Sequence, residues 1–267
     1  MPKKEVFKPL ESWKNPEFLA SPDGRPLRIL SEYFEPAAKF KKYNVENTIV
    51  FWGSARILPP AEAKKYLAET KKTGDEKDIS IAEHKLILSK YYDEAAKLAE
   101  MLTKWSMRSA KGKEFIIATG GAMGMMEAGN LGASRAGGKS IGLGISLPFE
   151  TGLNPYVTRE LGIQFHYFFM RKFWMVYLAK ALVAFPGGIG TLDELMEVLT
   201  LIQTGKPKKK MPIVLYGTHY WNDVLDLNAM VRWGTIKEKD LDMIKFCDTP
   251  DDAFEYLTGK LTEYYLK

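Results

Sequence analysis

A glycine-rich turn between a strand-like and a helix-like segment constrains the fold of this chain more than any other feature. Residues 181–185 are all apolar, which is typical of a buried parallel strand. A Pro-Gly-Gly-Ile-Gly turn follows at 186–190, and apolar residues then recur at helical spacing over 191–204. Such a turn points backbone N–H groups and the positive end of a helix dipole at one place. This arrangement suits a phosphate group.

The rest of the chain repeats the alternation of strand and helix. Strand-like runs lie at 48–52, 115–119, 140–145 and 212–216, and a short one is expected at 165–168. Helices are expected at 27–42, within 59–110 with a break at 74–77, and at 125–137 and 170–180, and helices are expected to finish the chain. We therefore predict an α/β fold, a Rossmann-like doubly wound parallel sheet with helices on both faces. Residues 1–45 are predicted to be an N-terminal extension and 46–267 a single domain.

The composition indicates a soluble protein without metal or disulfide chemistry. Of the 267 residues, 46% are hydrophobic and 27% charged, and the net charge of +5 favours anionic ligands without arguing for nucleic acid. A single cysteine, Cys247, excludes an internal disulfide, and the three histidines are scattered, so we expect no metal site. No signal-like or membrane-spanning segment is visible, which predicts a cytoplasmic protein that binds no membrane.

Three predicted strands end in small-residue turns, and these define the candidate binding site. The turns begin at Gly53, Gly120 and Gly187. In a doubly wound sheet the carboxyl ends of the strands line the binding crevice. Any one of these turns alone is better explained as a tight turn, whereas three together predict a nucleotide-sized ligand that carries phosphate. The spacing matches neither a dinucleotide fingerprint nor a P-loop, because no Gly-x-Gly-x-x-Gly follows the first strand and no Gly-Lys-Ser/Thr follows a glycine turn.

Two charged side chains stand out beside these turns. Glu194 lies one turn into the helix and off its apolar stripe, so we expect its carboxylate to avoid the core and to project beside the ligand. Arg171 lies among aromatic residues, where an arginine usually has an anionic partner, either a ligand or a carboxylate. The neighbouring Lys172 fits a solvated surface position about as well as a binding role.

The motif Pro-Gly-Gly-x-Gly-Thr-x-x-Glu at 186–194, preceded by Arg171-Lys172, resembles the LOG family of cytokinin riboside 5'-monophosphate phosphoribohydrolases. Proteins of this family are often mislabelled lysine decarboxylases. The segments at 51–56, 119–128, 147–150 and 201–206 resemble its longer bacterial branch. Lysine decarboxylation itself would need pyridoxal phosphate on a particular lysine, and no feature of the sequence singles one out.

The resemblance implies hydrolysis of the N-glycosidic bond of a nucleoside 5'-monophosphate, of the AMP or cytokinin riboside type, to free base and ribose 5-phosphate. It implies no cofactor, and it makes Arg171 and Glu194 the catalytic pair. The predicted substrate- and phosphate-binding residues are Gly187, Gly188, Ile189, Gly190, Thr191, Lys172, Gly120, Gly121, Gly124, Ser54, Glu127 and Glu150. The role of Glu194 stays open between stabilising a ribosyl cation, orienting water and attacking the anomeric carbon.

A second hypothesis is a nucleotide- or cofactor-binding carrier or sensor on the same fold, without turnover. Such a binder needs the glycine turn but has no need of a carboxylate beside it, so the presence of Glu194 and Arg171 favours the enzyme. A homo-oligomer, a dimer or a hexamer, is also predicted. The segment 165–177 carries more aromatic residues than one helix face can bury in its own core.

Overall fold

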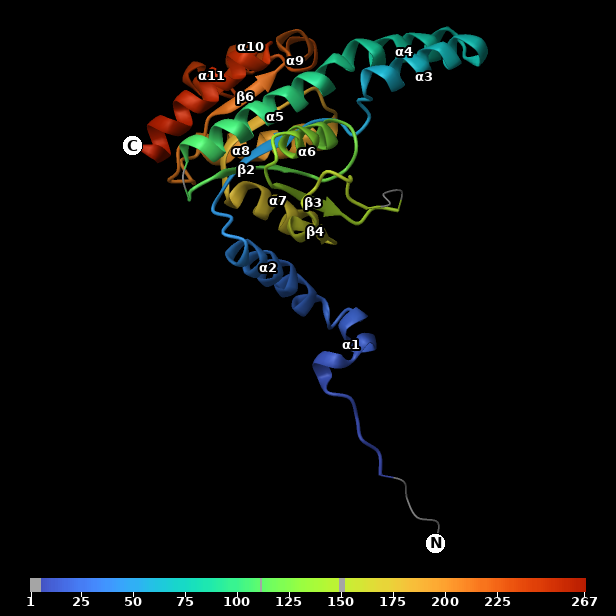
Figure 1. Ribbon diagram of the computed structural model, residues 1–267, viewed down its shortest axis with the longest axis vertical. Coiled ribbons are helices and arrows are strands. Elements are labelled where there is room, and N and C mark those ends of the chain that lie inside the picture. The colour runs from blue at the N-terminus through green and yellow to red at the C-terminus, as the bar shows by residue number, and fades with distance from the viewer. Residues whose placement is uncertain (1–5, 111, 149–151) are drawn as a thin grey trace.

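A parallel sheet forms the centre of the molecule (Figure 1), and its strand order determines where a ligand can bind. The structure, a computed structural model, describes residues 6–110, 112–148 and 152–267, and within these residues the sheet has seven strands in the order β4-β3-β2-β1-β5-β6-β7. All neighbouring strands are parallel. The strands are β1 (Asn47–Trp52), β2 (Phe115–Thr119), β3 (Ser140–Ile145), β4 (Gly162–Phe165), β5 (Ala179–Ala184), β6 (Ile213–Tyr216) and β7 (Ile244–Cys247).

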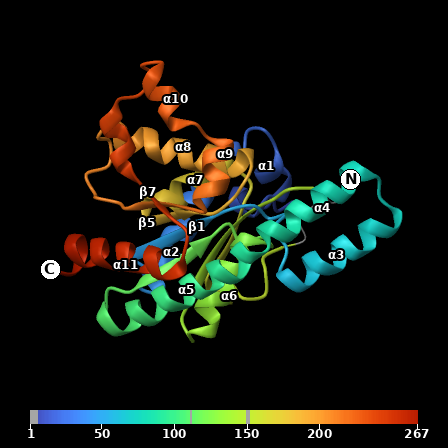
Figure 2. The ribbon, with the colours of Figure 1, turned by 90° about the horizontal axis from the view of Figure 1, so that it is seen from above.

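Helices cover both faces of this sheet. The helices of the described chain are α1 (Pro16–Ala20), α2 (Arg25–Lys42), α3 (Pro60–Thr73), α4 (Glu76–Leu88), α5 (Lys90–Ser109), α6 (Met125–Arg135), α7 (Phe168–Tyr177), α8 (Ile189–Gln203), α9 (Thr218–Val224), α10 (Leu227–Arg232) and α11 (Pro250–Leu261). Helices α5, α6 and α11 pack on one face, and α7 and α8 on the other (Figure 2). Successive β1 residues alternate between the two cores, Ile49 and Phe51 facing one and Val50 and Trp52 the other. The predicted doubly wound α/β fold is confirmed.

The strand order reverses between β1 and β5. From β1 the chain adds β2, β3 and β4 outward on one side, and α7 then carries it back to β5 on the other side of β1. The register pairs Trp52 with Ala184, so these two strands end side by side. In open α/β sheets such a switch point leaves a crevice at the carboxyl ends of the strands. The glycine turns at 53 and 187 both begin there.

Several element boundaries differ from the sequence prediction. Strand β4 begins three residues before the predicted run at 165–168 and ends at its first residue, and α7 and β5 each begin two residues before their predicted starts. The prediction that only helices finish the chain is wrong, because β7 pairs with β6 at the sheet edge. Within β7 the exposed Lys245 interrupts the apolar pattern that marks the central strands. The helical region predicted within 59–110 has a second break, at Ser89 between α4 and α5.

The N-terminal helices project from the body of the molecule (Figure 1). Helix α2 is anchored through Glu32, whose carboxylate accepts hydrogen bonds from the backbone N–H groups of His166 and Tyr167, at 2.7 and 3.2 Å. The indole of Trp174 donates to the Glu32 carbonyl at 3.0 Å, and Phe40 is buried in the core. The hairpin of α3 and α4 forms a second projection at the opposite end (Figure 1). In the described part of the chain, no helix combines the length and apolar character that crossing a membrane requires.

Candidate functional site

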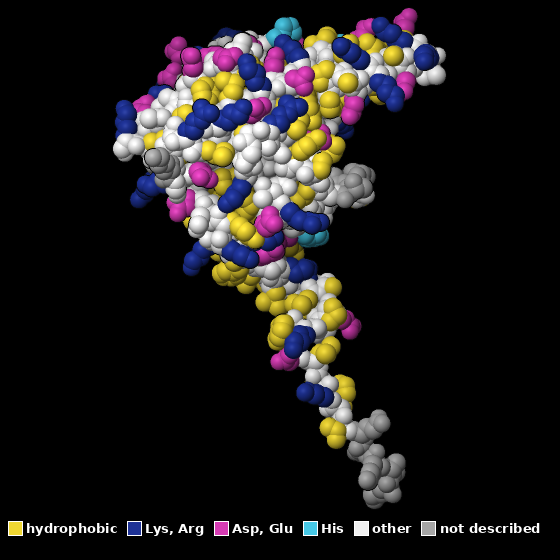
Figure 3. Space-filling model, viewed as in Figure 1, with side chains coloured by type: hydrophobic (Ala, Val, Ile, Leu, Met, Phe, Trp, Pro, Cys, Tyr) yellow, Lys and Arg dark blue, Asp and Glu magenta, His cyan; other side chains and the backbone are white. Residues whose placement is uncertain are grey.

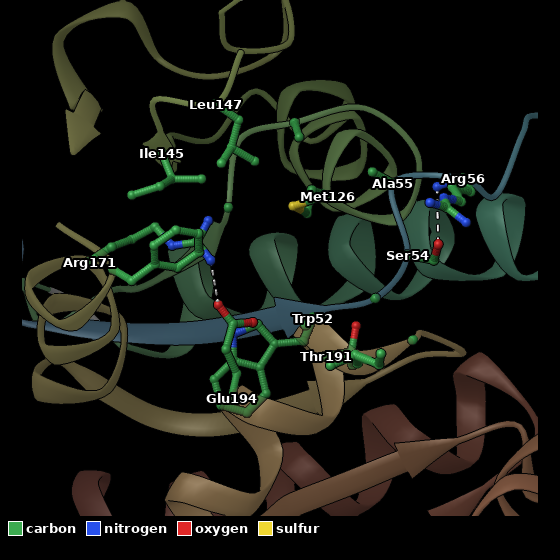
Figure 4. A pocket seen from close by; sticks show the side chains of 17 residues that line it. Trp52, Ser54, Ala55, Arg56, Met126, Ile145, Leu147, Arg171, Thr191 and Glu194 are labelled. Atoms are coloured by element: carbon green, nitrogen blue, oxygen red, sulfur yellow. Dashed lines mark hydrogen bonds and ion pairs between the residues drawn. The ribbon is translucent and has the colours of Figure 1, made fainter. Parts of the chain in front are cut away.

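A cavity of about 650 Å³ opens at the carboxyl ends of β1, β2 and β5 (Figure 4). It is lined by Trp52, Gly53, Ser54, Ala55, Arg56, Gly120, Ala122, Met126, Ile145, Leu147, Phe168, Arg171, Gly188, Ile189, Gly190, Thr191 and Glu194. All three glycine turns predicted from the sequence therefore reach one cavity, at the switch point of the sheet. Its volume falls within the range of small-molecule sites.

Close backbone contacts hold the three turns together. The N–H of Ser54 donates to the carbonyl of Pro186 at 3.0 Å, and the N–H of Met125 donates to the carbonyl of Ser54 at 3.1 Å. Gly124 has a φ of +68°, and a Cβ there would lie 2.6 Å from the Ser54 carbonyl oxygen. A side chain at Gly187 would collide with the hydroxyl of Thr191. Glycine at these two positions therefore allows the turns to meet.

A buried polar network supports the turn after β2. The hydroxyl of Thr119 donates to the side-chain oxygen of Asn130 at 2.7 Å, and the Asn154 amide donates to the same oxygen at 2.9 Å. The Asn154 amide also donates to the Gly121 carbonyl at 3.0 Å. These contacts fix the backbone of Gly120 where it lines the cavity. The sequence analysis missed this network, because Asn154 lies 33 residues from Gly121.

Arg171 and Glu194 form an ion pair in the cavity wall (Figure 4). Arg171 comes from α7 and Glu194 from the first turns of α8, and Arg171 Nη2 lies 3.0 Å from Glu194 Oε1. The two side chains are only 15% and 11% exposed. The guanidinium also lies over the ring of Phe168, at 5.4 Å from its centroid. Arg171 thus has a carboxylate partner, and Glu194 is more enclosed than its place off the apolar stripe indicated.

The environment of Glu194 makes its carboxyl group titrate near neutrality. Burial raises the pKa of Glu194 to about 7, although the Arg171 guanidinium lowers it. The nearby Asp193 raises this pKa further, and Lys172 lowers it. A carboxyl group with such a pKa beside a cavity is typical of a catalytic position, because it can give or accept a proton at neutral pH.

Lys172 points away from the cavity. Its ammonium lies 3.0 Å from an oxygen of Asp193 and 2.7 Å from an oxygen of Glu197, both on α8. One residue of helix turns the side chain by about 100°, so Arg171 and its neighbour face different surroundings. Lys172 joins α7 to α8 from outside the cavity, and its role in phosphate binding stays a prediction.

The other predicted binding residues divide into two groups. Those that line the cavity are Ser54, Gly120, Gly188, Ile189, Gly190 and Thr191. Gly121, Gly124 and Gly187 shape the turns behind the lining, and Glu127 is buried in α6 close to Tyr92. Glu150 lies outside the described residues. Whether these residues bind a ligand stays a prediction.

Two lining residues carry chemistry that the sequence analysis did not assign. Arg56 is exposed and lies across the cavity from the Arg171–Glu194 pair (Figure 4). Its backbone N–H donates to the hydroxyl of Ser54 at 3.1 Å, which shapes the first turn. Trp52 forms part of the wall beneath Glu194. The signal that could have identified Arg56 is its place two residues after the Gly53-Ser54 turn.

Fold and site together define an α/β protein with a cavity at the switch point of its sheet. A buried carboxyl group and its arginine partner line this cavity. A family model described as "possible lysine decarboxylase" matches residues 123–257, and the chain belongs to this family, the LOG family, as its motifs predicted. A rice relative (Oryza sativa subsp. japonica) named probable cytokinin riboside 5'-monophosphate phosphoribohydrolase LOGL2 is 35% identical over 96 residues. That match spans 35% of this chain and 37% of the rice protein.

Solved structures with a similar arrangement are more distant in sequence. A structural genomics target solved by X-ray crystallography is 21% identical, with a TM-score of 0.49 over 80% of this chain and 99% of its own. A molybdenum cofactor binding protein from Rippkaea orientalis is 22% identical, with a TM-score of 0.42 over 63% of this chain and 89% of its own. A Moco carrier protein from Chlamydomonas reinhardtii is 19% identical, with a TM-score of 0.46 over 81% of this chain and 99% of its own.

Proposed function

We propose that the protein hydrolyses the N-glycosidic bond of a nucleoside 5'-monophosphate, of the AMP or cytokinin riboside type, to free base and ribose 5-phosphate. One observation carries this proposal. A buried carboxyl group with a pKa near 7, paired with an arginine, faces the same cavity as a glycine turn at a helix N-terminus. Family membership and the name of the rice relative support the same class of reaction.

The glycine turn supplies the phosphate-binding half of the site. Helix α8 begins at Ile189, and the first N–H donated within the helix is that of Leu192, to the Gly188 carbonyl at 3.0 Å. The N–H groups just before it have no acceptor within the helix, so they are available to an anion. Thr191 and Ser54, which both carry hydroxyl groups, line the same cavity. A 5'-phosphate bound there would fix the ribose beside Glu194.

The Arg171–Glu194 pair supplies the chemical half. When the bond between C1' and the base nitrogen breaks, its electron pair leaves with the base and positive charge develops on the ribose. An ionised Glu194 stabilises this charge more strongly in the transition state than in the ground state. Water then forms the new bond to C1', and its proton ends on the base or on solvent. Arg171 favours the ionised form of Glu194, which this mechanism requires.

The direct test is to incubate the purified protein with AMP, GMP, CMP and isopentenyl-AMP and to separate the products by chromatography. We expect free base and ribose 5-phosphate in equal amounts from at least one of these nucleotides. Absence of base release from all four, with retained binding, would favour the carrier or sensor hypothesis. We also propose that the protein acts in the cytoplasm as a homo-oligomer.

A further inference from the structure

Trp52 carries a buried indole N–H for which the described residues provide no acceptor. The residue ends β1, is 2% exposed, and its Nε1 makes no hydrogen bond within the described chain. Two other buried tryptophans differ. Trp174 donates to the Glu32 carbonyl at 3.0 Å, and Trp221 donates to the Ala184 carbonyl at 3.1 Å. Because buried indole N–H groups usually have a partner, the isolated one on Trp52 calls for an explanation.

Water cannot supply that partner from the inner side of the wall. Trp52 shares a narrow void with Glu194, Glu197, Lys172 and Met175, and the void is too small to admit a water molecule. In Figure 4 the Trp52 indole and the Glu194 side chain lie on the same side of the cavity, and both residues line it. The strong hydrogen-bond acceptors among the side chains that line this void are the carboxylates of Glu194 and Glu197.

Of these two carboxylates, Glu194 is the better acceptor for Trp52. Glu197 is 39% exposed, and its Oε2 lies 2.7 Å from the ammonium of Lys172. Glu194 is 11% exposed, its Oε1 accepts from Arg171, and its Oε2 accepts no hydrogen bond from the described residues. In the described chain, an indole N–H without an acceptor and a carboxylate oxygen without a donor therefore belong to two residues that line the same void.

We propose that Trp52 is a positioning residue for Glu194. The two groups are not hydrogen-bonded as they stand. A small shift of the carboxylate lets Glu194 Oε2 accept from the indole N–H, which holds Glu194 in place when a bound ligand draws Arg171 away. The charged groups that face Glu194 are Arg171 and Lys172 from α7, and Asp193 and Glu197 from α8. On the β1 side, the proposed hydrogen-bond donor to Glu194 is the indole N–H of Trp52. The consequence for turnover rests on the proposed function, whereas the proposed hydrogen bond between Trp52 and Glu194 does not.

The contact is tested by following the six indole N–H resonances of the ¹⁵N-tryptophan-labelled full-length protein between pH 5 and 9. We expect the Trp52 resonance to move downfield as Glu194 ionises, with a midpoint near the Glu194 pKa of about 7, and Glu194→Gln to abolish this movement. The Trp174 resonance is the internal control, because the indole N–H of Trp174 donates to a backbone carbonyl. A Trp52 resonance that does not titrate, or that titrates unchanged in Glu194→Gln, would overturn the inference.

Trp52→Phe assigns the resonance and tests the consequence. If this variant does not fold, replacing the other five tryptophans one at a time gives the assignment. In the folded variant we expect kcat for base release to fall, KM for AMP to stay within about twofold, and the pH midpoint of kcat to rise by about one unit. An unchanged pH profile would contradict a positioning role. If the wild-type protein releases no base, the proposed function fails, and the resonances still decide the contact.

Discussion

At the scale of single residues, the site depends on one carboxyl group kept in an unfavourable environment. Burial favours the neutral form of Glu194, and Arg171 favours the ionised form. The balance leaves the group close to half-ionised at neutral pH, whereas an exposed glutamate is fully ionised there. A carboxyl group in this state responds strongly to a bound ligand, because either partner of the ion pair can be displaced. The two residues are therefore best tested separately.

The first prediction concerns Arg171. We expect Arg171→Ala to lower base release about a hundredfold or more and Arg171→Lys to restore little, because an ammonium lacks the planar fork of a guanidinium. Thermal melts give the control. If Arg171→Ala melts several degrees earlier but keeps its activity per folded molecule, the arginine is structural. If the melt is unchanged and turnover collapses, it belongs to the catalytic machinery.

The second prediction concerns stability and pH. The pKa of Glu194 is raised from 4.5 to about 7. Between pH 4.5 and about 7, Glu194 therefore keeps its proton in the folded state and has lost it in the unfolded chain. Stability from this group is therefore present below pH 4.5 and is lost as pH rises through 7. The full effect is of the order of 3 kcal/mol. We expect Glu194→Gln to gain stability relative to wild type across this window in urea titrations.

The control for that measurement is Glu69→Gln, on the exposed surface of α3. This variant also removes one carboxylate, but from a site outside the cavity, so it measures the effect of losing a negative charge elsewhere on the molecule. A Glu194→Gln curve that runs parallel to wild type over pH 4.5–8 would show that Glu194 titrates normally.

At the scale of elements, the strand-turn-helix unit of β5 and α8 positions the site. The turn must bring Gly187 against Thr191, and a Cβ at Gly187 would collide with that side chain. We expect AMP to be a better substrate than adenosine, because only AMP carries the phosphate. We expect Gly187→Ala to raise KM for AMP about tenfold or more and to leave any hydrolysis of adenosine unaffected. Gly259→Ala, at an open position in α11, is the matched control. Equal losses for AMP and adenosine would contradict a phosphate-binding turn.

The elements also show how far the sequence determines the fold. Strands β2 and β3 match the predicted bounds, because each is a short run of buried residues between polar segments. The bounds of β4, α7 and β5 were misplaced because these elements form one nearly continuous apolar stretch. In such a stretch neither the helical nor the strand spacing of apolar residues dominates. Strand β7 was missed because a short edge strand with an exposed lysine lacks the buried pattern.

Those parts of the candidate site that lie within one short sequence motif could be predicted. Glu194 and the turn before it belong to one strand-turn-helix unit, and the aromatic context of Arg171 indicated an anionic partner. That this partner is Glu194 depends on how α7 packs against α8. The roles of Trp52 and Lys172 depend on the same packing. Spacing along the chain does not reveal such contacts, because they join elements brought together by the tertiary fold.

At the scale of the whole molecule, apolar surface extends along the N-terminal helices and α7. Large side chains on the N-terminal segment are exposed, including Phe7 and Trp13, and hydrophobic atoms gather on this projection in Figure 3. On α7, Phe173 stacks on Tyr177 at 5.1 Å and contacts Tyr33 of α2 at 5.8 Å. Contiguous exposed apolar surface of this kind is typical of protein interfaces.

We therefore expect the protein to be a homo-oligomer in solution. Multi-angle light scattering should give at least twice the 30.3 kDa of one chain at micromolar concentration. The double variant Phe169→Lys and Tyr177→Lys, which changes two exposed α7 residues, should reduce the mass toward that of a monomer. Trp233→Lys, exposed at the end of α10, should leave the mass unchanged. A wild-type monomer at these concentrations would contradict this expectation.

The central claim is that Glu194 performs chemistry on a bound nucleotide. The most direct measurement compares wild type and Glu194→Gln for AMP binding by calorimetry and for adenine release by chromatography. We expect the variant to bind AMP within a few-fold of wild type and to release adenine at least about a hundredfold more slowly, because the amide keeps the shape and removes the charge. Adenine release by Glu194→Gln at close to the wild-type rate would contradict the account.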